Sequence, residues 1–89
     1  MPEICRFFQV IIRMYAMDHA PPHFHAIFGD YEGVFSISSG RRLEGKFPKK
    51  QERLVTAWAQ IYKKELLENW KSLTSGQGFK KIDPLNLDK

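Results

Sequence analysis

Two adjacent prolines, Pro21 and Pro22, constrain this chain more than any other feature of its sequence. Each proline ring fixes φ near −65° and removes a backbone donor, and the second proline keeps the first out of the helical region. The segment around them is therefore stiff and extended. The His-Phe-His-Ala-Ile-Phe pattern that follows is typical of a strand, so we expect a rigid turn that leads into a strand over residues 23–28.

The same segment holds all three histidines of the chain, in the order DHAPPHFH over residues 18–25. Alternate side chains of a strand share a face, so His23 and His25 should point one way and Phe24 the other. Two imidazoles on one face can ligate zinc or another first-row ion, with Asp18 and His19 as further ligands. The three histidines are equally candidates for catalytic proton transfer, or for hydrogen bonds to backbone groups that the prolines leave unpaired.

The 89 residues, of which 43% are hydrophobic, are enough for one small domain with a modest core. No apolar run approaches the roughly 20 residues that span a bilayer, and the first residues do not have the pattern of a signal peptide. The single cysteine, Cys5, cannot form an internal disulfide and is typical of a reducing compartment. We therefore expect a cytoplasmic protein with no membrane association.

Charge is unevenly distributed along the chain. Residues 1–40 carry a net charge of −2 and residues 41–89 a net charge of +6, which gives +4 overall. The densest basic cluster contains Arg41, Arg42, Lys49, Lys50 and Arg53. Such a cluster can bind phosphate groups, including those of RNA, or an acidic partner protein, although a solvated face has the same composition.

Alternation of apolar residues predicts that all strands precede the helices. The expected strands cover residues 3–8, 10–17, 23–28, 31–38 and 41–47, with turns near Phe8-Gln9, Gly29-Asp30 and residues 38–40. The second strand is apolar at nearly every position, so it should be central and covered on both faces. The fourth should place Tyr31, Phe35 and Ile37 on one face. The last should be the most exposed strand, with Leu43 and Phe47 turned inward.

Pro48 is well placed to open a helical region. Leu54, Trp58 and Ile61 form one apolar stripe, whereas Leu66, Trp70 and Leu73 form a second stripe more than about 100° away on the same helical wheel. One straight helix would bury only one stripe, so we expect helices over 49–62 and 64–74 with a break near Lys63-Lys64. Residues 75–89 form a tail that docks on the body, adds a strand to a partner's sheet edge, or frays; its apolar residues are Phe79, Ile82, Leu85 and Leu87.

This order of elements predicts a single α+β domain over residues 1–89. Residues 1–47 are expected to be β-rich, 48–74 helical and 75–89 an extended tail. The architecture should be a small, mostly antiparallel sheet of four to five strands, followed by two C-terminal helices packed on one face.

Several segments together resemble the bacterial family called domain of unknown function 4160. They are the opening MPEICRF, the IIRMY segment at 11–15, DHAPPHFH at 18–25, LLENW at 66–70 and KIDPL at 81–85. Gln9 stands where many relatives have a turn glycine. The resemblance implies a small cytoplasmic protein encoded beside a second short family, domain of unknown function 2442, in an arrangement like that of a toxin–antitoxin pair or a regulatory operon.

These observations leave several functions open. The first is an interaction module that acts with a small partner of that second family, or that associates with itself. The second is a histidine-dependent ribonuclease, in which His19, His23 and His25 move protons and the basic cluster neutralises phosphate. The third is a protein that binds zinc or a similar ion through Asp18 and the histidines. A DNA-binding regulator has less support, because no basic recognition helix stands out.

Overall fold

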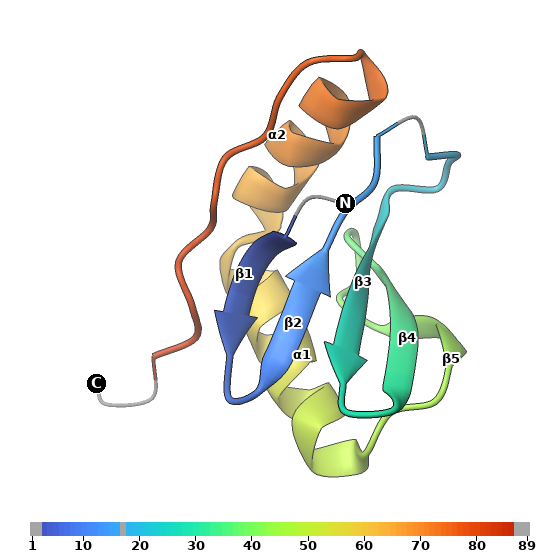
Figure 1. Cartoon of the computed structure of the whole chain (residues 1–89), viewed down its shortest axis with the longest axis vertical. Helices are drawn as coiled ribbons and strands as arrows, with labels where there is room; N and C mark the ends of the chain where they lie inside the picture. Colours follow the sequence, from blue (N-terminus) through green and yellow to red (C-terminus); the bar gives the residue numbers. More distant parts are fainter. Residues whose placement is uncertain (1–2, 17, 87–89) are drawn as a thin grey trace.

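The computed structural model describes residues 3–16 and 18–86. It confirms the predicted fold class, an antiparallel five-stranded sheet followed by two C-terminal helices (Figure 1). The strands are β1 (Glu3–Phe7), β2 (Val10–Arg13), β3 (His23–Phe28), β4 (Tyr31–Ser36) and β5 (Arg42–Gly45), and the helices are α1 (Lys49–Ile61) and α2 (Lys63–Thr74). Among the described residues, neither helix is long and apolar enough to cross a membrane.

The sheet is a meander in which each strand pairs with the next one in the chain, in the order β1-β2-β3-β4-β5. β3 is therefore the central strand. The turn at Gly29-Asp30 pairs Phe28 with Tyr31, and from that pair the register places His25 opposite Val34. The first hairpin turns at Phe8 and Gln9, which both have the left-handed backbone, with φ of 47° and 66°.

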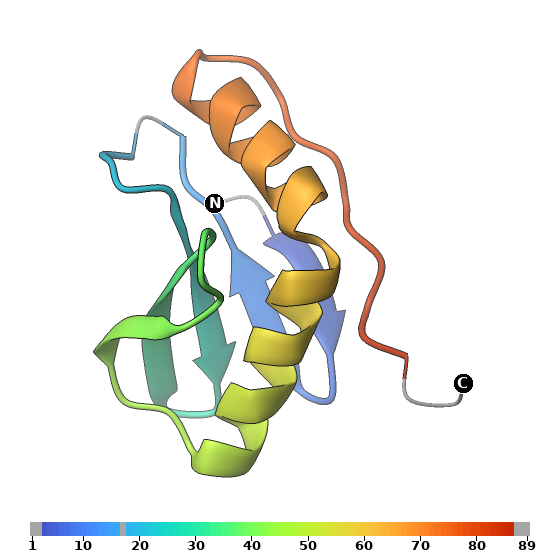
Figure 2. The same cartoon turned by 180° about the vertical axis from the view of Figure 1, so that it is seen from behind.

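The core lies between the sheet and the two helices, which both lie on the same side of the sheet (Figure 2). Trp58 of α1 is fully buried there, and it contacts Phe7 and Phe24 with ring centroids 5.4 and 5.8 Å apart. Phe24 stacks on Phe35 of the neighbouring strand, with centroids 5.5 Å apart. Cys5 is buried at the same face, and burial raises the pKa of its thiol to about 11, so it acts as a small apolar residue.

The β2 region departs from the expectation of a strand covered on both faces. Strand structure ends at Arg13, Met17 lies outside the described residues, and the burial of β2 alternates along its length. Val10 and Ile12 are fully buried on the helix side, whereas Ile11 and Arg13 are only partly buried on the other. The reason is that both helices cover one face, so this apolar strand is half-buried in spite of its composition.

Two residues near the sheet's other edge are also more exposed than predicted. The β4–β5 register shifts between Val34 and Phe35, which pair with Glu44 and Arg42, so Leu43 is an extra residue. Such a bulge interrupts the alternation of faces, and Leu43 is half exposed instead of turned inward. Tyr31 is also exposed, because it lies at the hairpin end of β4, whereas Phe35 and Ile37 are buried as expected.

The break between the helices is confirmed, and it falls at Tyr62. The predicted stripe of α1 was wrong at one position, since Ile61 is 62% exposed. The buried stripe instead contains Val55, Trp58 and Ala59, with Tyr62 partly buried. Ile61 lies about 110° from the centre of that stripe on a helical wheel. A small alanine and an amphipathic tyrosine, which the apolar pattern did not count, therefore determine which face is buried.

The tail docks on the body up to the last described residue, and Leu87 lies beyond that point. The backbone N–H of Ile82 donates to the carbonyl of Ile4 in the edge strand β1, at 3.0 Å. The buried Asn69 of α2 holds the main chain of Lys80 at both ends: its Nδ2 donates to the carbonyl at 2.8 Å, and its Oδ1 accepts from the amide at 2.9 Å. The tail therefore covers part of the β1 edge of this same chain.

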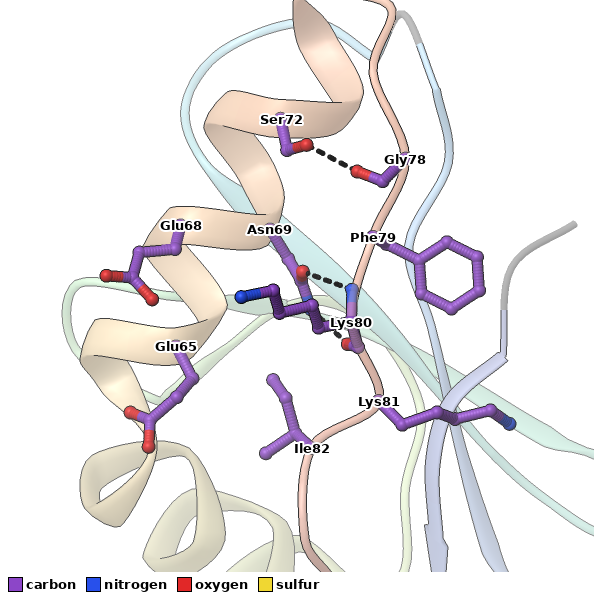
Figure 3. A pocket seen from close by; sticks show the side chains of 9 residues that line it. All are labelled: Glu65, Glu68, Asn69, Ser72, Gly78, Phe79, Lys80, Lys81 and Ile82. Atoms are coloured by element: carbon purple, nitrogen blue, oxygen red, sulfur yellow. Dashed lines mark hydrogen bonds between the residues drawn. The ribbon is translucent and has the colours of Figure 1, made fainter.

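Figure 3 shows the hollow, of about 450 Å³, that α2 and the tail enclose. Two side chains of α2 connect its walls, since Asn69 pairs with the main chain of Lys80 and the hydroxyl of Ser72 donates to the carbonyl of Gly78. This hollow is therefore the space left where the C-terminal tail packs against α2.

Replacement of Asn69 with alanine should lower the free energy of unfolding by about 1–3 kcal/mol, because it leaves two main-chain groups of Lys80 without partners. Urea unfolding measures the change. Lys80→Ala is the matched control, since the tail is held through the backbone of Lys80 and its side chain is exposed. Equal stability of Asn69→Ala and the parent protein would mean that the clamp does not hold the tail.

Replacement of Gln9 with glycine should raise the free energy of unfolding by about 0.5–1 kcal/mol, because relief of left-handed strain outweighs the entropy that glycine adds to the unfolded chain. Thermal or urea unfolding measures it. Gln9→Ala retains the strain and should give no gain. A glycine variant less stable than the parent would contradict the strained turn.

Candidate functional site

The turn between β2 and β3 brings Asp18 against two histidines of the central strand. Asp18 Oδ2 lies 2.8 Å from His23 Nε2 and 3.7 Å from His25 Nε2. The backbone N–H of His19 donates to the other carboxylate oxygen, Oδ1, at 3.0 Å, which holds the carboxylate in place. One carboxylate is therefore shared by two imidazoles.

The two histidines share a side of β3, as the alternation predicts. Their ring centroids are 5.5 Å apart, while Phe24 between them points into the core and is fully buried. The strand's pleat thus places an apolar ring on the core side and turns the two imidazoles to the other side, where His23, at the start of the strand, also meets Trp70 of α2.

The second nitrogen of each imidazole, Nδ1, also has a hydrogen-bond partner. His23 Nδ1 donates to the carbonyl of Pro21 at 2.7 Å, and His25 Nδ1 donates to Glu32 Oε2 at 3.3 Å. Hydrogen bonds at Nδ1 fix the orientation of each ring and direct both Nε2 atoms toward Asp18. Metal-bound histidines characteristically have this arrangement, in which a carbonyl or carboxylate holds the nitrogen that does not bind the ion.

Aromatic residues pack around the two imidazoles. The ring of His23, which is buried, lies 5.1 Å from the indole of Trp70 on α2. The ring of His25 meets the edge of Tyr15 at 4.6 Å. The cluster opens into a hollow of about 290 Å³ that β4 and β5 help to line through Val34, Leu43 and Glu44. His23 is thus enclosed by packing, whereas Asp18 and His25 are only partly buried and give the cluster its access to the hollow.

The pKa of Asp18 reflects opposing effects. Partial burial raises the pKa of this carboxyl, but the amide of His19 and the charges of His23 and His25 outweigh burial and hold the pKa below its usual range. His23 is engaged at both ring nitrogens, since its Nδ1 bonds to the carbonyl of Pro21 and its Nε2 lies 2.8 Å from Asp18 Oδ2. The contact holds the Asp18 carboxylate against the ring of His23.

The three side chains fit the requirements of one metal ion. One ligand atom from each of Asp18, His23 and His25 can be chosen so that all lie within 4.8 Å of one another. Bond lengths of about 2.0–2.2 Å place tetrahedral zinc ligands about 3.3 Å apart, between the two Asp18–histidine distances. Asp18, His23 and His25 are therefore the residues that could hold one ion.

His19, the remaining candidate, lies at the rim. Its side chain is 89% exposed, and its Nδ1 is 3.4 Å from the other carboxylate oxygen of Asp18. The metal-ligand grouping found among the described residues does not include it. Of the four side chains proposed from sequence, the structure thus brings three into one compact group.

The basic cluster lies elsewhere. Arg41, Arg42 and Arg53 line a separate hollow against α1, while Lys49 and Lys50 occupy the first turn of that helix. This hollow and the histidine hollow have no lining residue in common. The structure therefore does not bring the histidines and the basic residues into one site.

Sequence reasoning missed three neighbours of the histidines, which are Tyr15, Glu32 and Trp70. Glu32 was predictable, because the two-residue turn at Gly29-Asp30 fixes a register that pairs Ile27 with Glu32, diagonally adjacent to His25. Trp70 was correctly assigned to the core, but its contact with His23 depends on how α2 crosses the end of the sheet. No local pattern encodes that crossing.

Replacement of Asp18 with asparagine should destabilise the metal-free protein at neutral pH, and this difference should vanish in acid. Because the pKa of Asp18 is lowered in the folded protein, the ionised carboxylate stabilises the fold at pH values above the unfolded-state pKa of about 3.9. This contribution is lost as the pH falls through the folded-state pKa. Urea unfolding between about pH 3 and 7 with a chelator measures the difference. Asp30→Asn, at an exposed turn, is the charge control. A constant difference across this range would refute the assigned role.

Comparison with known proteins adds a family but no function. No curated protein and no solved structure matches the chain. A family model described as "Domain of unknown function (DUF4160)" matches residues 10–71, which is more than half of the chain and includes Asp18 and all three histidines. The chain belongs to this family, domain of unknown function 4160.

Proposed function

We propose that this protein is a small metal-binding module in which Asp18, His23 and His25 hold one first-row divalent ion, with zinc the best fit. The observation that carries the proposal is the convergence of both Nε2 atoms on one carboxylate oxygen, while Pro21 and Glu32 engage both Nδ1 atoms. Two imidazoles and a carboxylate suit zinc or iron(II). Packing against Trp70 and Tyr15 supports a fixed geometry.

An ion held by three protein ligands keeps at least one coordination position for water or another ligand. The hollow beside Val34, Leu43 and Glu44 is the space into which that position would open. Structural zinc sites usually have four protein ligands, so three ligands and an accessible hollow favour an exchangeable or reactive position. The role of the side chains is to hold and orient the ion.

The biological role that we propose for this module is action with a small partner protein, of the domain of unknown function 2442 family, in a toxin–antitoxin-like or regulatory operon. The feature that supports a partner is β5, whose four residues are all exposed. An exposed edge strand can accept another chain's strand through main-chain hydrogen bonds, and the half-exposed Leu43 offers an apolar contact.

The ribonuclease alternative has less support. It needs imidazoles and phosphate-binding cations around one scissile bond, and the two groups line different hollows. His23 is also buried and engaged at both ring nitrogens. The cluster is better arranged to hold an ion than to deliver protons to a polynucleotide.

Untagged protein should contain close to one zinc or similar ion per chain, and added zinc should raise its thermal midpoint. Zinc at about 100 times its Kd stabilises a folded protein by about 2.7 kcal/mol. The double variant His23→Ala/His25→Ala should lose both effects. His19→Ala is the matched control and should retain them, because that ring lies at the rim. Less than about 0.1 ion per chain, with no thermal shift in zinc, would overturn the metal proposal.

The partner proposal has its own test. Co-expression with the neighbouring gene product should yield a complex that elutes as one species. Leu43→Lys should weaken that complex, because it puts a charge in place of the exposed apolar side chain on the edge strand. Separate elution of the two proteins at micromolar concentration would contradict the partner role and leave the metal result unaffected.

A further inference from the structure

The hollow that Arg41, Arg42 and Arg53 line has a volume of about 510 Å³ and lies between the turn after β4 and helix α1. Three of its seven lining residues are arginines, and one is acidic; the full set is Arg41, Arg42, Glu52, Arg53, Thr56, Ala57 and Gln60. None of them is a candidate metal ligand. A function of this hollow is therefore independent of the metal proposal.

The turn is held against α1. The hydroxyl of Thr56 donates to the carbonyl of Gly40 at 2.8 Å, and Gly40 has a φ of +75°. A Cβ at Gly40 would lie 3.3 Å from the backbone oxygen of Thr56, so glycine permits this close approach. The position of Arg41, the next residue, is consequently fixed by contacts with the helix.

The three arginines are not equivalent. Arg42 Nε donates to Glu52 Oε1 at 2.8 Å, and its guanidinium also donates to the carbonyl of Gly45, so its charge is neutralised and its position fixed. Arg41 and Arg53 are exposed, and neither makes an ion pair within the described part of the chain. The hollow therefore presents two uncompensated guanidinium groups beside a third that is held in place.

We propose that this hollow binds the phosphate backbone of a nucleic-acid duplex. Guanidinium groups bind phosphate through paired hydrogen bonds, and a protein that reads only phosphates needs no base-contacting helix. Lys49 lies one helical turn before Arg53 on α1, and Lys50 is the residue after Lys49. The two lysines extend the positive surface beyond the hollow.

The composition of the hollow distinguishes a duplex from other anionic partners. Its lining contains no large apolar side chain, whereas the centre of a protein–protein interface is typically apolar or aromatic. It contains no aromatic ring on which an unpaired base could stack, which disfavours single strands. What remains is a polar, positive surface of the kind that contacts duplex phosphates without regard to sequence.

Fluorescence anisotropy with labelled DNA and RNA duplexes of one sequence tests the proposal. The full-length protein should bind a duplex more tightly than either single strand, and affinity should fall steeply between about 50 and 200 mM salt. Arg41→Gln/Arg53→Gln should weaken binding about tenfold or more at the low-salt end and reduce the salt slope by about two, one for each lost phosphate contact. A preference between the two duplexes identifies the nucleic acid.

Lys71→Gln/Lys81→Gln removes the same net charge from exposed residues outside this hollow and is the matched control, expected to change binding little. Arg53→Lys keeps the charge and should retain the salt slope. Circular dichroism verifies that each variant is folded. Equal weakening in the two double variants, preference for a single strand, or binding of polyglutamate with no binding of either duplex would overturn the proposal.

Discussion

The alternation of side chains along β3 links the core of this protein to its candidate site. Phe24 points to the helix side, where it packs between Phe35 and Trp58, and the histidines before and after it point to the opposite side. A one-residue slip of β3 would bury imidazoles in the core and expose the phenylalanine. The hydrophobic energy that fixes the register therefore also fixes the direction of both imidazoles.

The turn before β3 adds the third component. Pro21 supplies the carbonyl that accepts from His23, and Asp18 supplies the carboxylate that both rings approach. The cluster lies at the start of β3 on the side opposite Phe24, and it borders a hollow that Val34 and Leu43 also line. The polar site therefore lies on one face of β3, and the apolar core lies on the opposite face of the same strand.

The sequence predicted the order of elements, the class of fold and the shared face of His23 and His25, because these depend on local periodicity and on turns with defined geometry. The predictions from sequence were wrong where the burial of a residue depends on tertiary packing. The bulge at Leu43 removes that residue from the inward face, and the stripe of Val55, Trp58 and Ala59 leaves Ile61 in solvent. The contact of Trp70 with His23 and the clamp of Asn69 on the tail join segments that are distant in sequence, so no local pattern reveals them.

We propose that both imidazoles bind a metal ion through Nε2 while Nδ1 keeps its proton. NMR of the ring nitrogens during a zinc titration distinguishes the two nitrogens of each ring. One equivalent of zinc should shift the Nε2 resonances of His23 and His25 together and leave their Nδ1 atoms protonated. Unchanged ring nitrogens at one equivalent, or ligation through Nδ1, would contradict it.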